Sequence, residues 1–582
     1  MNQNTRFLLI AALVLNVFTI QAQSTRKKST TKPVPATVAD STQKTKANTD
    51  ATKAVSEKPL RKEFQAAKSS EVYYMIPTGN LGVSIIYPSP DKKNGMTEWL
   101  WSTYSTEFEE TASNTFTVDS KLDYGDYYYD ETAGHIYILF GKADAVPNFP
   151  VMDGYLGKFE IVDLDIHAKS MNRRTGEFAQ KMHMNFMKSI NGDLYIGGSI
   201  VPTKSQVRSA VCLAMITCFI GGKKRFDVFP YLVKITSKGV NEIKLPISNQ
   251  GEVLALDYDS TQKKILCTAL DAPLPVDRRV MVCELNSSGS PGKPTTIKGT
   301  NNYYLLNAQV QAVSATDKIV IGTYAKRDPK DPLLFGIPRK ERNAMPASTG
   351  MYIVRISGTA QTFQQFYPFS KFADISDQVE VAKKEVEHKS DKKKAKAEAQ
   401  FSYNILPHRI IAHGDQYIMI GEAYHSVYHS ESYQTYNNGK WENHTRRVFD
   451  GWKYDYALVG GFDKGGDMKW NTTLRLSGQM TWLLREQVKV LQNPGNEKIV
   501  MVYATDGEIK SKVLNGETLE ESAASVKIFT GTDEKVAKSS SNISYWYGNY
   551  FIAYGYQNLE KKNEKGKKEK RAVFFLNKVS YR

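Results

Sequence analysis

The stretch His413-Gly-Asp-Gln-Tyr-Ile-Met-Ile-Gly421 decides the fold of this chain, because it recurs. It is a turn followed by a short apolar run that ends in glycine. Two further clear copies are Asn191-Gly-Asp-Leu-Tyr-Ile-Gly-Gly198 and Tyr547-Gly-Asn-Tyr-Phe-Ile-Ala-Tyr-Gly555. Such a run begins seven times, near His135, Leu194, Ile265, Ile319, Tyr417, Ile499 and Phe551. Self-similarity at this spacing predicts a repeat architecture and says little about chemistry.

A second apolar run follows each first run after a variable distance. In the best copy, Phe462-Asp-Lys-Gly-Gly-Asp-Met-Lys-Trp470 then adds a tight glycine turn and a third strand. Such antiparallel meanders, repeated along a chain, are typical of propeller blades. Val, Ile, Tyr and Phe fill the strand-like runs, and helical periodicity of useful length is nearly absent. We therefore predict an all-β fold, a β-propeller of seven blades, with eight as the next choice and long inter-strand loops.

The segment from Tyr456 to Trp470 also resembles the repeats of bacterial exported β-propeller proteins. In those repeats a strand ending in Asp, a Gly turn and a strand bearing Trp recur. The resemblance covers residues 413–474 and implies a fold only. We further expect Val72 to Tyr87 to supply the strand that completes a last blade begun by the C-terminal run.

The N-terminus predicts export. Arg6, an apolar segment from Phe7 to Ile20 and the small residue Ala22 form a signal peptide over residues 1–22. Residues 23–68 are rich in Ser, Thr, Lys and Pro and are expected to be a disordered tail. A single propeller domain would occupy 69–582. We expect no transmembrane segment in the mature chain, and a location in the periplasm or at the outer cell surface of a Gram-negative bacterium.

The formal net charge of +16 is concentrated in three tracts. Residues 24–63, 383–398 and 561–571 carry +6, +3 and +5, so the rest of the chain is nearly neutral. The first tract belongs to the tail and the other two interrupt strand patterns, as solvated loops do. Export and this distribution favour flexible basic segments, and we expect no nucleic-acid partner.

The chain has only four cysteines, so disulfides do not hold the fold together. Cys212 and Cys218 lie in one apolar run and would be too far apart to bond if that run is a single strand. Cys267 and Cys283 lie in consecutive predicted strands and could face each other across a hairpin. A disulfide between them and four buried free thiols both remain open.

Four insertions interrupt the repeats, at about 325–349, 371–402, 423–454 and 557–571. Long insertions in repeat proteins are where binding usually occurs. The 423–454 insertion combines aromatic rings with charges, the composition of a recognition surface. Its candidate binding residues are Tyr424, Tyr428, Tyr433, Tyr436, Trp441, Arg446, Arg447 and Trp452. The partner would be a protein or a glycan; the alternative is that these rings pack the insertion against its own blade.

No motif points to catalysis or to a cofactor. Histidines are frequent between 408 and 444, but His425 and His429 would share a metal only on a helix. On an extended strand they lie about 13 Å apart, so we assign no metal site. Neither Gly-x-Ser-x-Gly, a Walker loop nor His-Glu-x-x-His occurs. The sequence therefore predicts an exported, non-catalytic binding or scaffold module at the cell envelope. One alternative is a propeller hydrolase or lyase acting on polysaccharide, and another is a binder of anionic surfaces through the Lys-rich loops.

Overall fold

The computed structural model describes most residues between Leu60 and Ser580. Its longer gaps are 145–154, 201–228, 376–402 and, apart from two short strands, 327–346. The predicted signal peptide, most of the predicted tail, Cys212, Cys218 and the basic tract at 383–398 lie outside the described residues. No helix in the described part is long and apolar enough to cross a membrane.

Antiparallel strands dominate, which confirms the all-β prediction. The first sheet contains β2 (Tyr74–Pro77), β3 (Val83–Lys93), β4 (Met96–Tyr104) and β5 (Glu110–Asp119). The second contains β6 (Asp123–Asp130), β7 (His135–Asp144), β8 (Tyr155–Asp165), β9 (Ser170–Ile190), β10 (Asp193–Ile200), β11 (Phe229–Thr236) and β12 (Gly239–Glu242). The third contains β13 (Gly251–Asp259), β14 (Lys264–Asp271), β15 (Arg279–Leu285) and β16 (Thr295–Lys298).

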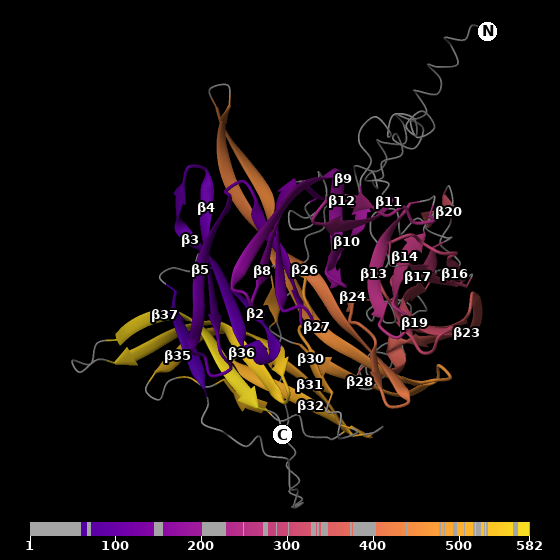
Figure 1. Cartoon of the computed structure of the whole chain (residues 1–582). Coiled ribbons are helices and arrows are strands. Elements are labelled where there is room, and N and C mark those ends of the chain that lie inside the picture. Colours follow the sequence, from indigo (N-terminus) through magenta and orange to yellow (C-terminus); the bar gives the residue numbers. More distant parts are fainter. Residues whose placement is uncertain are drawn as a thin grey trace, which may run out of the picture. The chain divides into compact units, whose positions relative to one another are not determined.

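Four more sheets follow along the chain (Figure 1). The fourth contains β17 (Tyr303–Leu305), β18 (Gln309–Ala312), β19 (Asp317–Lys326), β22 (Gly350–Ser357) and β23 (Ala360–Pro368). The fifth contains β24 (Asn404–Pro407), β25 (Ile411–His413), β26 (Gln416–Asn437), β27 (Lys440–Asp463), β28 (Met468–Arg475) and β29 (Met480–Thr481). The sixth contains β30 (Lys489–Gln492), β31 (Lys498–Thr505), β32 (Glu508–Asn515), β33 (Thr518–Leu519) and β34 (Ser525–Lys527). The seventh contains β35 (Lys535–Tyr547), β36 (Tyr550–Lys562), β37 (Lys568–Ser580) and β1 (Arg61–Gln65).

Four further small elements lie in the described chain. Strands β20 (Leu333–Leu334) and β21 (Ile337–Pro338) pair only with each other, and two 3-10 turns are η1 (Gly79–Leu81) and η4 (Phe369–Lys371).

Each of the seven repeated apolar runs forms an interior strand of a sheet, namely β7, β10, β14, β19, β26, β31 and β36. The first sheet is a further meander that the repeat pattern does not include. Strand β9 is 21 residues long and joins two meanders into the seven-stranded sheet. The described strands thus contain eight meanders, one more than the number of copies found in the sequence.

The apolar runs are continuous because both faces of each strand are buried. In β26, Met419 packs with Ile321 of the fourth sheet, whereas the next residue, Ile420, packs with Ile499 of the sixth sheet. Successive side chains of a strand point to opposite faces, so consecutive apolar residues belong to two different cores. Each sheet is therefore stabilised by its neighbours in the sequence, as expected for repeat units that are unstable alone.

Glycine ends several of these runs because the adjacent strand comes too close for a side chain. A Cβ atom on Gly198 would lie 2.0 Å from the His183 carbonyl oxygen, at an irregularity in the pairing of β10 with β9. Gly555 has φ +154° and would place a Cβ 1.9 Å from the Ser540 carbonyl oxygen. The repeated glycine is thus a requirement of strand packing.

The last sheet is completed by β1, which corrects two predictions. Arg61–Gln65 lie in the segment expected to be a disordered tail, yet they pair with β37. Val72 to Tyr87, expected to complete the last blade, instead contribute β2 and β3 to the first sheet. Arg61–Gln65 are held at the edge of β37 because the Phe64 ring packs against Phe574 and Tyr104, whose ring centroids lie 6.0 and 5.5 Å away.

Two predicted insertions are extensions of strand pairs. The described residues of 423–454 belong to β26 and β27, which Figure 1 draws as two long orange strands. The described residues of the 557–571 segment likewise continue β36 and β37. Chain that looks like a loop in the sequence is here held by backbone hydrogen bonds between two antiparallel strands.

Candidate functional site

The β26–β27 hairpin forms a two-stranded ribbon over most of its length. The two strands pair from Gln416 and Asp463 out to Asn437 and Lys440. Strand β24 pairs with β26 only as far as Tyr424, and β29 pairs with β27 only at Trp452 and Lys453, so the outer part has no further strand beside it among the described residues. Both edges of the outer ribbon are therefore unpaired within the described part of the chain.

An aromatic cluster occupies one face at the base of this hairpin. The ring of Phe449 lies 5.5 Å from Tyr428 and 5.1 Å from Trp452, and Trp452 lies 5.3 Å from Tyr424. Phe449 is buried and the other three are half-buried. Three of the predicted binding residues thus pack the hairpin onto its own sheet, the alternative that the sequence left open.

Two aromatic side chains at the tip are different, because they are exposed. Tyr436 is 63% and Trp441 68% exposed, and their ring centroids are 5.1 Å apart at 58°. On the opposite face, Tyr433 is 45% exposed, stacks on His444 and lies 5.7 Å from the guanidinium carbon of Arg446. The structure thus divides the predicted site into a packed base and an exposed tip; the side chain of Arg447 lies outside what the structure describes.

Charged pairs line the face that carries Tyr433. Arg446 donates to Glu431 at 2.9 Å, and His425 lies 2.8 Å from Asp455. The hydrogen bond with Asp450 raises the pKa of His429, whereas the hydrogen bond from Arg446 lowers the pKa of Glu431. His425 pairs with one carboxylate and His429 with two, Asp450 and Glu431. The described residues contain no group of three or more His, Cys, Asp or Glu arranged to hold a metal.

A cavity of about 520 Å³ forms a second polar site, which the sequence did not reveal. Its lining includes Asp257, Tyr258, Gln311, Arg409, Val490 and Tyr545. Asp257 comes from β13, Gln311 from β18, Val490 from β30 and Tyr545 from β35, each at an edge of its sheet. The lining residues are spread over almost 300 positions of the chain, from Asp257 to Tyr545, and belong to no motif. Only the arrangement of the sheets brings them together.

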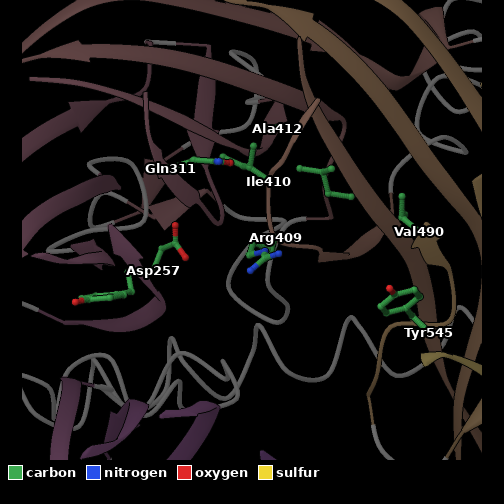
Figure 2. Close-up of a pocket in the computed structure, with 9 residues that line it drawn as sticks. Asp257, Gln311, Arg409, Ile410, Ala412, Val490 and Tyr545 are labelled. Atoms are coloured by element: carbon green, nitrogen blue, oxygen red, sulfur yellow. The ribbon is translucent and has the colours of Figure 1, made fainter. Parts of the chain in front are cut away.

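Arg409 is the central cation of this cavity. It lies between β24 and β25, where the neighbouring residues His408 and Ile410 are buried and Arg409 is exposed, as in an extended segment. Figure 2 shows its guanidinium nitrogens facing the open space between Asp257 and Tyr545. Among the described residues Arg409 has no hydrogen bond and no ion pair.

The other charges around the cavity are paired. Lys188 lies 3.2 Å from Asp257 and also donates to the Leu256 carbonyl oxygen; its burial lowers its pKa. Glu486 lies 3.6 Å from Lys489. The Oε1 atom of Gln311 is buried and accepts no hydrogen bond.

A buried carboxylate, Glu422, contacts His408, the residue that precedes Arg409. Both oxygens of Glu422 accept the backbone N–H of Gln487, one also accepts that of Val488, and the Nε2 atom of His408 lies 2.8 Å away. Burial alone would lower the pKa of His408, but the charges of Glu486 and Glu422 raise it. This network fixes the backbone between the fifth and sixth sheets, next to Arg409.

The two described cysteines are buried free thiols. Cys267 faces Cys283 directly across β14 and β15. Their mutual hydrogen bond and burial raise the pKa of the Cys267 thiol. The two residues face each other across the predicted hairpin, and both belong to the apolar core as free thiols.

Comparisons with known proteins identify no family. No protein-family model matches the chain, and no curated protein is significantly similar to it. The polysaccharide lyase Uly1 is 9% identical at a TM-score of 0.34, over 77% of this chain and 88% of that chain. A puromycin-hydrolyzing peptidase of Mycobacterium tuberculosis is 10% identical at a TM-score of 0.34, over 82% of this chain and 58% of that chain. A variant of Synechocystis apocarotenoid oxygenase is 10% identical at a TM-score of 0.29, over 51% of this chain and 62% of that chain. Likeness at this level carries no argument about what the chain does.

Proposed function

We propose that this protein is an exported β-propeller that acts as a non-catalytic binding module at the cell envelope, in the periplasm or at the outer surface of a Gram-negative bacterium. The observation that carries the proposal is the exposed tip of the β26–β27 hairpin, where Tyr436 and Trp441 are more than half exposed. Large aromatic rings at the end of a rigid ribbon supply contact area with little loss of conformational entropy on binding.

A protein partner is favoured over a glycan. The rings of Tyr436 and Trp441 are tilted by 58° and present no flat platform for stacking a sugar. The other face alternates charge pairs with Tyr433, which suits the mixed polar and aromatic surface of a protein interface. The free edges of the outer ribbon also offer backbone hydrogen bonds to an added strand.

The propeller itself rests on three observations. Each meander packs against the next, β1 from the beginning of the chain completes the last sheet, and edge strands of five successive sheets line one cavity. A closed ring of blades places the inner edge of every blade around a common centre. Eight blades agree with the eight meanders, so we favour the second of the two numbers that the sequence suggested.

The test is site-specific photo-crosslinking in the producing cells. A photoreactive phenylalanine at Tyr436 is expected to yield a discrete protein adduct, which Trp441→Ala abolishes. The matched control carries the same residue at Val526, an exposed position on β34, and yields none. The mature chain recovered from the envelope fraction should begin near Gln23. Absence of an adduct from correctly exported protein would contradict the proposal, as would tip-dependent binding to a glycan array.

The hydrolase or lyase alternative keeps one observation in its favour, because charged side chains do converge at the cavity. Its carboxylate Asp257 is already paired with Lys188, and no second carboxylate is among the described lining residues. A two-carboxylate glycosidase mechanism needs one group as acid and another as base or nucleophile. Release of reducing ends or unsaturated products from a polysaccharide, lost on Asp257→Asn, would establish this alternative.

The anionic-surface alternative has less support in the described part of 561–571. Lys568 and Lys570 both pair with Glu560, and Arg571 pairs with Glu63 and Glu534. Cations that are paired within the protein add little to attraction by a distant surface.

A further inference from the structure

We infer that the cavity around Arg409 is a ligand site for a small hydroxylated carboxylate of the sugar-acid class. This site is separate from the hairpin tip, and the inference does not depend on the function proposed for that tip. A volume of about 520 Å³ accommodates one or two sugar-sized units and lies within the range of small-molecule pockets.

The charge of the ligand follows from the pairing around the cavity. Lys188 neutralises Asp257 and Lys489 neutralises Glu486, so the guanidinium of Arg409 is the cation left over. It is exposed to the cavity and has no hydrogen bond or ion pair with any residue that the structure describes. A guanidinium presents parallel N–H donors that match a carboxylate in a bidentate geometry.

The hydroxyl groups of the ligand follow from the uncharged polar side chains that line the cavity, among them Gln311. Its amide lines the cavity together with Tyr545, whose hydroxyl donates to the Gly548 carbonyl oxygen and can still accept a hydrogen bond from a ligand. A bare carboxylate offers only acceptors, so a ligand that bonds to this hydroxyl oxygen must carry a donor as well. The Tyr545 ring is 41% exposed, which suits contact with a polyhydroxylated ring.

Isothermal titration calorimetry on the mature chain tests this inference with three probes. D-Glucuronate carries both features, adipate carries the carboxylate without hydroxyls, and D-glucose carries the hydroxyls without the carboxylate. Glucuronate is expected to bind at least ten-fold more tightly than either of the others, because each lost polar contact weakens binding by about that factor. A methyl glycoside of glucuronate distinguishes a glycan unit from a free acid, and equal binding supports the glycan source.

Variants assign the binding to this cavity. Arg409→Gln should weaken glucuronate binding at least ten-fold, and Arg409→Lys should restore part of it. Arg475→Gln is the matched control, since Arg475 is an exposed arginine at the end of β28 and does not line the cavity. Unchanged thermal unfolding of all three variants shows that they are folded. No binding of glucuronate by the wild type, an unchanged affinity in Arg409→Gln, or equal affinity for adipate would overturn the inference. Loss of tip crosslinking with intact glucuronate binding would contradict only the hairpin proposal.

Discussion

Glu422 is the residue on which the junction of the fifth and sixth sheets depends. It is fully buried, and its oxygens accept backbone N–H groups of Gln487 and Val488 besides facing His408. Buried carboxylates are tolerated only where their lone pairs are used in this way. The backbone amides that precede β30 depend in turn on this one side chain for a partner.

Glu422→Ala should therefore lower the free energy of unfolding by about 3 kcal/mol or more, because two buried N–H groups lose their acceptor. Urea unfolding measures the change. Glu442→Gln is the control: that glutamate is exposed on the hairpin, and its substitution should leave the urea midpoint almost unchanged. Equal midpoints for the two variants would show that the network adds nothing to stability.

His408 makes part of this stability dependent on pH. The charges of Glu486 and Glu422 raise its folded-state pKa above the unfolded value of about 6.5 despite burial. The contribution of protonated His408 is thus fully present below about pH 6.5 and is lost as the pH rises through the folded pKa. The advantage of the wild type over His408→Gln in urea should be larger near pH 6 than near pH 9. An advantage that grows with pH would show that burial dominates instead.

At the scale of elements, the sequence pattern predicts the inner strands of the sheets but not the outer ribbon of the β26–β27 hairpin. Continuous apolar runs and glycine turns predicted the interior strands, because a strand buried on both faces carries apolar residues at consecutive positions. The ribbon at 423–454 is half-exposed and mixes rings with charges, so it looks like a loop in the sequence. The division of its rings between base and tip depends on strand register, which fixes the face of each residue.

The hairpin base and tip should respond differently to substitution. Phe449→Ala is expected to cost about 3 kcal/mol of unfolding free energy, since this buried ring packs on both Tyr428 and Trp452. Tyr436→Ala at the exposed tip should leave the urea midpoint close to that of the wild type. A destabilised Tyr436→Ala would mean that the tip is covered within the folded protein, and its role as an interface would fail.

At the scale of the whole molecule, the cavity and strand β1 of the last sheet could not be predicted from the sequence. Arg409 and Gln311 have no local signal, since a single polar residue beside an apolar run is common in any strand protein. Their significance arises only when edge strands of five sheets meet. Strand β1 was missed for a related reason: five residues with one aromatic ring do not stand out beside a Lys-rich tail, and their partner β37 lies about 500 positions away.

Strand β1 gives the last prediction, which concerns closure of the fold. A variant lacking residues 54–66 leaves the outer edge of β37 unpaired and removes Phe64 from its contacts with Tyr104 and Phe574. It also removes the hydrogen bond from Arg61 to Gln557. The lost strand pairing and burial should lower the free energy of unfolding by on the order of 5 kcal/mol, and the exposed edge should promote association. The control lacks only residues 54–59, keeps β1, and should unfold at the same urea concentration as the full mature chain. Identical midpoints and monomeric elution for both truncations would show that β1 is dispensable and that the boundary of the folded domain lies where the sequence first placed it, at residue 69.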